Sequence, residues 1–92
     1  MSFKLRLFIA GGTPDSTQAQ SNLNALCRSR IPDQYEIEIV DVFLHPERAL
    51  AEGVFMTPMF IVLEPLPQRR IAGTLSNAGV LAGTLGLAAH PE

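Results

Sequence analysis

A chain of 92 residues predicts one domain, because a core of this size does not usually divide into two. With 47% hydrophobic and 17% charged residues it can bury a core, while a net charge of −2 with scattered basic residues argues against nucleic-acid binding. A single cysteine excludes an internal disulfide bond, no apolar run is long enough to span a membrane, and the lack of a targeting segment predicts a cytoplasmic location.

The first two predicted elements are a strand and a helix. Residues 3–10 alternate apolar with basic side chains and then turn wholly apolar, which is typical of a strand entering a buried sheet. Residues 13–16 supply an N-cap, a proline at the first helical position and an acid in the first turn, so a helix begins here and ends near Pro32. Its cysteine lies on the apolar stripe, which predicts a buried, inert thiol. The stripe is Ala19, Leu23, Leu26 and Cys27.

The next two predicted elements are a second strand and a short helix. In residues 35–42 apolar side chains alternate with Glu36 and Glu38, which predicts a strand with one partly wet face. A helix then opens at Pro46, and Gly53 ends it.

Two strands and a helix complete the predicted order. Residues 59–63 are a continuous apolar run, as in a strand covered on both faces. A proline-rich turn over residues 64–68 leads to a short strand over residues 69–73, paired with the previous one as a hairpin. Ser76 and Asn77 can cap a last helix, although three glycines weaken it by roughly 1 kcal/mol each relative to alanine.

The order β-α-β-α-β-β-α predicts an α/β fold whose sheet has an exposed edge. Right-handed crossovers make the first two strands parallel, and the third strand pairs beside the first. The spatial order is then second, first, third, fourth, which puts residues 35–42 at the edge. Such a strand can accept a partner's strand through backbone hydrogen bonds, although the charges of Glu36, Glu38 and Asp41 serve equally to discourage aggregation.

Two turns and several short motifs carry a family resemblance. The turns are Ala-Gly-Gly-Thr-Pro-Asp-Ser at residues 10–16 and Met-Thr-Pro at residues 56–58. The motifs are Val-Asp-Val at 40–42, His-Pro-Glu at 45–47, Leu-Pro at 66–67, Arg-Arg-Ile at 69–71 and Gly-Thr-Leu-Ser-Asn at 73–77. The element order is thioredoxin-like, and the motifs in this order and spacing resemble the KaiB family over nearly the whole chain.

The resemblance implies a KaiB-like domain over residues 1–92 and a non-enzymatic, regulatory role in circadian or stress-related timing. The partners it implies are a KaiC-type ATPase, a KaiA-like protein, and further copies of the chain in a dimer or tetramer. It also implies a metamorphic protein that binds partners as a thioredoxin-like monomer and rests as a tetramer with a different C-terminal half. The implied partner-binding residues are Glu36, Glu38, Val40, Gly53, Phe55 and Met56, and the implied cis-proline is Pro58.

Two alternative functions stay open. Residues 13–16 stand at the redox-motif position of thioredoxins but lack both cysteines, so thiol–disulfide exchange is excluded there and a capped helix start is the ordinary interpretation. A thioredoxin-superfamily enzyme, such as a glutathione-dependent transferase or reductase, would use Ser16 or Thr13 to orient a thiol. The other alternative is a structural oligomer without a regulated partner.

We expect no catalytic residues, no cofactor and no metal. No acid–base pair has catalytic spacing, and no glycine loop with a lysine could cradle nucleotide phosphates. His45 and His90 lack partners at metal-ligand spacing. The adjacent Arg69 and Arg70 could bind an acidic partner or lie on a solvated strand face.

Overall fold

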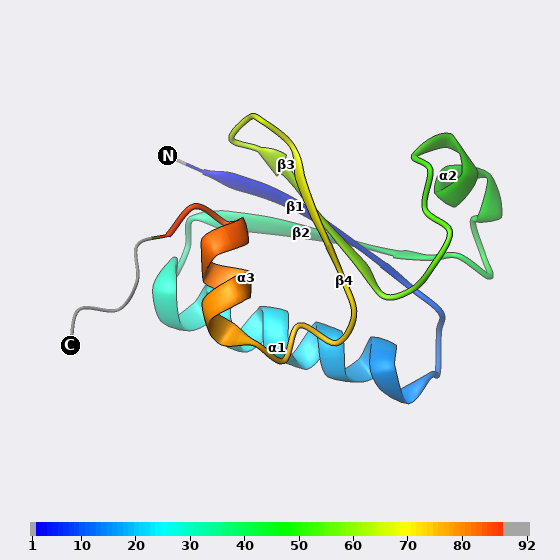
Figure 1. Cartoon of the computed structure of the whole chain (residues 1–92), viewed down its shortest axis with the longest axis horizontal. Helices are drawn as coiled ribbons and strands as arrows, with labels where there is room; N and C mark the ends of the chain where they lie inside the picture. Colours follow the sequence, from blue (N-terminus) through cyan, green and yellow to red (C-terminus); the bar gives the residue numbers. More distant parts are fainter. Residues whose placement is uncertain (1, 88–92) are drawn as a thin grey trace.

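The structure, a computed structural model that describes residues 2–87, contains every predicted element in the predicted order (Figure 1). It is an α/β domain with a mixed sheet and three helices. The strands are β1 (Phe3–Ile9), β2 (Tyr35–Asp41), β3 (Met59–Glu64) and β4 (Arg69–Ala72). The helices are α1 (Pro14–Arg30), α2 (Pro46–Ala51) and α3 (Ala78–Thr84).

The sheet has the order β2-β1-β3-β4, as predicted. β1 runs parallel to β2, with Phe3 opposite Tyr35, and antiparallel to β3, with Leu7 opposite Phe60. β4 pairs antiparallel with β3 on the far side. The C-terminal half therefore has the thioredoxin-like arrangement, in which residues 59–63 lie beside the first strand.

The larger core lies between the sheet and the helices α1 and α3, which share one face of the sheet (Figure 1). Period-2 alternation directs every second side chain of β1 and β3 to this face, where they meet the apolar stripe of α1. Cys27 is fully buried there, which confirms its predicted place on the stripe. The largest contributors are Leu5, Leu7, Leu23, Phe60, Leu81 and Leu85.

A smaller core lies on the opposite face, where α2 covers only one end of the sheet (Figure 1). Phe8 from β1, Val40 from β2 and Ile61 from β3 form its floor, and Ala49 and Val54 close it. The other end of this face carries charged side chains in place of a helix. The sheet is thus largely covered on one side and half covered on the other.

The sequence predicts side-chain caps at the starts of α1 and α3, and the structure has such a cap only at α3. Thr13 has the extended backbone of an N-cap, but it makes no capping bond because its hydroxyl donates to the carbonyl oxygen of Ala10 at 2.7 Å. Asn77 does cap α3, since its Oδ1 accepts a hydrogen bond from the N–H of Val80 at 3.0 Å. This cap supports a seven-residue helix that contains Gly79 and Gly83.

Within residues 2–87, none of the helices has the length and hydropathy needed to cross a membrane. The same residues contain no group of three or more His, Cys, Asp or Glu side chains that could hold a metal ion. His45 forms a 3.7 Å pair with Glu47, and His90 lies outside the described residues.

Replacing Leu7 with alanine tests the larger core. Leu7 is completely buried, so we expect Leu7→Ala to lower the free energy of unfolding by about 3 kcal/mol through lost transfer energy and a residual cavity. Leu66→Ala removes the same atoms from an exposed turn and should cost less than about 0.5 kcal/mol. Urea denaturation followed by circular dichroism measures both, and equal losses would contradict this packing.

Candidate functional site

The start of α1 carries the two hydroxyl residues that stand at the thioredoxin redox position. Ser16 is only 2% exposed, and its Oγ accepts a hydrogen bond from the N–H of Ala10 at 3.0 Å. The Thr13 hydroxyl is bonded to the carbonyl of the same residue. Both side chains therefore serve the turn that joins β1 to α1.

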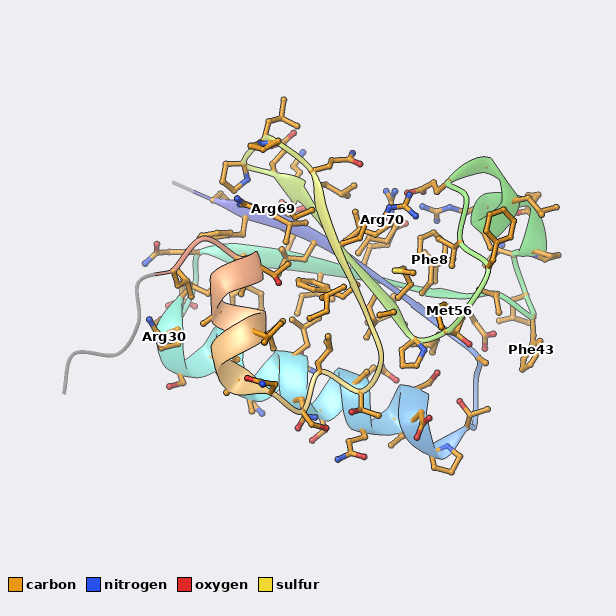
Figure 2. All side chains as sticks on the ribbon, in the orientation of Figure 1. Phe8, Arg30, Phe43, Met56, Arg69 and Arg70 are labelled. Atoms are coloured by element: carbon orange, nitrogen blue, oxygen red, sulfur yellow. The ribbon has the colours of Figure 1, made fainter. Side chains whose placement is uncertain are left out.

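An apolar surface surrounds α2. Large hydrophobic side chains that are exposed in residues 2–87 gather here, on α2 itself and on the loops that enter and leave it; Figure 2 shows Phe43 and Met56 on these loops. Phe55 is the most exposed, at 84%. A patch of this kind marks an interaction site far more often than a chance cluster does. We call it the α2 surface, and it consists of Phe43, Leu44, Leu50, Phe55 and Met56.

The shortness of α2 explains why these side chains are exposed. Its six residues make fewer than two turns, and only Ala49 is buried against the sheet. Gly53, with a φ of +66°, ends the helix in a conformation that favours glycine and sends the chain back across the sheet. The large apolar residues on either side of α2 are therefore exposed to solvent.

Asp41, at the end of β2, fixes the loop that leads into the α2 surface. Its Oδ1 accepts hydrogen bonds from the N–H of Phe43 at 2.9 Å and from the N–H of Gly11 at 3.3 Å. A Cβ atom at position 11 would lie 2.1 Å from the other carboxylate oxygen, so a larger residue there would displace the Asp41 side chain. The carboxylate thus joins the β1–α1 turn to the loop carrying Phe43.

The strand β2 forms an edge of the sheet, as predicted, because it pairs only with β1. Glu36 and Glu38 are exposed on the face that α2 partly covers, whereas Val40 on that face is 1% exposed and lies beneath the helix. The outer backbone groups of β2 have no partner strand within residues 2–87. This edge is available for strand addition.

A network of ion pairs joins α2 to the sheet. Arg48 on α2 donates through Nη1 to Oε2 of Glu38 at 2.8 Å and through Nη2 to its Oε1 at 3.0 Å, a bidentate fork. Arg6 on β1 donates through Nε to Oε1 of Glu38 at 2.7 Å and through Nη1 to Glu52 at 2.6 Å. We call these four side chains the α2 clamp.

The adjacent arginines of β4 point to opposite faces of the sheet, as strand geometry requires. Arg70 reaches toward α2 (Figure 2) and donates to the carbonyl oxygens of Glu52 and Gly53, which follow that helix. Arg69 lies on the α3 side, where its Nε is buried without a hydrogen-bond partner in the described residues. Neither residue is simply a solvated charge. Arg70 adds two bonds to the contacts that the clamp makes with the end of α2.

The clamp changes the acidity of Glu38. Hydrogen bonds from Arg48, and then from Arg6, lower the pKa of the Glu38 carboxyl to about 2. Its side chain is 45% exposed, so solvent screens each pair and its contribution to stability is small. Burial has the opposite kind of effect on the Cys27 thiol, whose pKa it raises to about 11, as expected of an inert cysteine.

Comparison with known sequences decides the family. The family model of the KaiB domain matches residues 6–87. The circadian clock protein KaiB3 of Synechocystis sp. is 41% identical over 88 residues, which cover 96% of this chain and 84% of that protein. This chain belongs to the KaiB family. The circadian clock oscillator protein KaiB of Thermosynechococcus vestitus is 34% identical over 76 residues, covering 83% of this chain and 70% of that protein. Both KaiB relatives carry clock names, which supports a role in clock regulation.

Comparison with solved structures shows that the chain has a thioredoxin-like fold. The N-terminal domain of SasA from Synechococcus elongatus aligns with a TM-score of 0.74 and 18% identity, covering 100% of this chain and 90% of that one. The germline-specific thioredoxin Deadhead of Drosophila melanogaster aligns with a TM-score of 0.74 and 17% identity, covering 92% and 79%. At such identities the likeness concerns the fold alone.

Three of the residues that the KaiB resemblance implies for partner binding are presented to solvent. Phe55 and Met56 lie on the α2 surface, and Glu36 lies on the edge strand. Within the described residues Glu36 forms no ion pair. These side chains can meet a partner directly.

The other implied residues are engaged within the KaiB fold. Glu38 belongs to the clamp, the carbonyl of Gly53 accepts a bond from Arg70 at 3.4 Å, and Val40 is buried. Pro58 is also buried and follows a cis peptide bond; the bonds preceding Pro65 and Pro67 are cis as well.

Sequence reasoning missed three members of the α2 surface and both arginines of the clamp. Phe43, Leu44 and Leu50 could have been found, because a helix as short as the predicted one cannot bury apolar residues on both of its flanks. Arg6 and Arg48 gave no signal in the sequence, because each lies in a different element from their common partner, Glu38.

Replacing Arg48 with glutamine tests the clamp. Arg48→Gln removes the bidentate partner, so the pKa of Glu38 should rise from about 2 toward its ordinary value of about 4.3. Because the folded-state pKa is lowered, the clamp stabilises the fold fully above about pH 4.3, and this contribution is lost as the pH falls toward 2. Carbon NMR titration of the Glu38 carboxyl measures the change.

The matched control for that titration is Arg28→Gln, on the exposed last turn of α1. It removes the same charge far from the clamp and should leave the Glu38 titration as it is in the unmodified chain. A Glu38 midpoint near 4 in the unmodified chain would show that the ion pairs do not persist in solution.

Proposed function

We propose that this KaiB-family chain is a non-enzymatic regulatory protein that binds a KaiC-type ATPase through the α2 surface and the edge strand β2. The observation that carries the proposal is the exposure of large apolar side chains around α2. Family membership supports the clock setting. A cytoplasmic location stays a prediction from the sequence.

The chemistry of the α2 surface fits a protein partner. Aromatic and methionine side chains are enriched in the buried centres of interfaces, and Phe43, Phe55 and Met56 are of these types. The exposed pair of His45 and Glu47 supplies a polar rim beside them. An apolar centre with a charged margin is the usual anatomy of a protein-binding patch.

The free edge of β2 supports the two further partner predictions. Backbone groups along this edge can pair with a strand from a KaiA-like protein, or with the same edge of a second copy in a dimer or tetramer. Exposed Ile39 adds an apolar contact on the α1 side of that edge. The edge and the α2 surface are joined through β2, so one partner can contact both.

The enzyme alternative has little support from the local chemistry. The Ser16 hydroxyl is buried and accepts a hydrogen bond from the N–H of Ala10, and the Thr13 hydroxyl donates to the carbonyl of Ala10, so both side chains serve the turn before α1. Assays of insulin reduction and glutathione conjugation should show no activity above background. Turnover in either assay, abolished by Ser16→Ala, would favour the enzyme.

The binding proposal is tested by mixing the chain with a purified KaiC-type ATPase and ATP and following complex formation over a long incubation. We expect a complex, and we expect Phe55→Ser to weaken it by at least about tenfold, because it removes a central aromatic contact. Leu66→Ser makes a comparable change on the exposed β3–β4 turn and should have no effect. No complex, or equal weakening by both variants, would contradict the proposal.

A further inference from the structure

We propose that Glu38 is a positioning residue, which holds the α2 surface in place through Arg48 and Arg6 and does not itself touch the partner. This inference rests on the proposed binding function. It separates Glu38 from Glu36, the acid two positions earlier on the same strand and the same face.

The first step is that α2 has little apolar attachment of its own. An isolated helix of six residues is not stable in water, so this helix depends on contacts with the rest of the fold. It buries only Ala49, and the next buried residue, Val54, comes after the helix has ended. Polar contacts must therefore contribute to its placement.

The second step is that Glu38 joins α2 to the sheet by binding both Arg48 of the helix and Arg6 of β1. Oε1 accepts hydrogen bonds from Arg6 and Arg48, and Oε2 accepts a second bond from Arg48. A carboxylate that already accepts three charge-assisted bonds offers little to an incoming partner. A partner that used Glu38 would have to break the fork that holds the helix.

The third step is that the clamp reaches the residues of the α2 surface. Arg6 also binds Glu52, immediately after α2, and Arg70 holds the carbonyl groups of Glu52 and Gly53. Phe55 and Met56 follow only two and three residues later. The position of the segment that carries Phe55 and Met56 is therefore held by side chains of β1, β2 and β4.

The fourth step is the contrast with Glu36. It is exposed, it faces the uncovered end of the sheet, and it forms no ion pair with any other residue that the structure describes. A free carboxylate on an edge strand can meet a basic group of a partner without cost to the fold. The two acids therefore have different tasks, although the sequence presents them as equivalent.

A double-mutant cycle with the KaiC-type ATPase tests the assignment. Glu38→Gln and Arg48→Met should each weaken the complex about fivefold, the affinity equivalent of a strong exposed ion pair. If Glu38 acts through Arg48 and Arg6, the double variant should be no weaker than Glu38→Gln alone, because that change already releases Arg48. Additive losses would overturn the inference, since they would show that Glu38 contacts the partner.

Backbone amide exchange in the free chain provides a second readout that needs no partner. Glu38→Gln should speed exchange at Gly53 and Val54, whose N–H groups bond to the carbonyls of Leu50 and Ala49. Glu64→Gln, the same change at the exposed end of β3, should alter neither exchange nor binding. Unchanged exchange in Glu38→Gln would overturn the inference. If the unmodified chain forms no complex, the proposed function fails, and exchange alone still decides whether the clamp positions the loop.

Discussion

The pairing of β3 with β1 is the contact on which the rest of the structure depends. It places an apolar strand with three consecutive buried residues at the centre of the sheet, where Phe60 and Val62 face α1 and Ile61 faces α2. β4 then follows as the far strand, and α3 returns to pack beside α1. Both cores use this strand, so its position beside β1 determines which surfaces are buried and which are presented.

The uneven covering of the two sheet faces follows from helix length. α1 has seventeen residues and, with α3, covers most of one face, whereas α2 has six and covers only one end of the other. The uncovered end carries charged side chains, of which Arg6 and Glu38 pair with each other and with the α2 segment. An apolar face left open there would be a liability, and charged strand faces avoid it. Most of the exposed large hydrophobic side chains of residues 2–87 lie instead on α2 and on the loops beside it.

The sequence was sufficient for the element order, the strand order and the burial of Cys27, because these depend on local periodicity, capping residues and handed crossovers. It was insufficient where a side chain chooses between partners. Thr13 satisfies the turn before its helix and leaves the cap bond unmade, and Glu38 is separated from Arg6 by 32 residues in the chain. Pairing across such distances depends on the register of strands, which alternation alone does not specify.

The bonds from Arg70 to the carbonyl groups after α2 tie β4 to the segment that carries Phe55 and Met56 of the α2 surface. These bonds exist only while β4 lies beside β3, so the arrangement of the α2 surface depends on the β3–β4 hairpin. A partner that binds the α2 surface would therefore bind more tightly when β4 is in place, even without contacting that strand. Recognition and folding of the C-terminal half are then thermodynamically linked, and each favours the other by the same free energy.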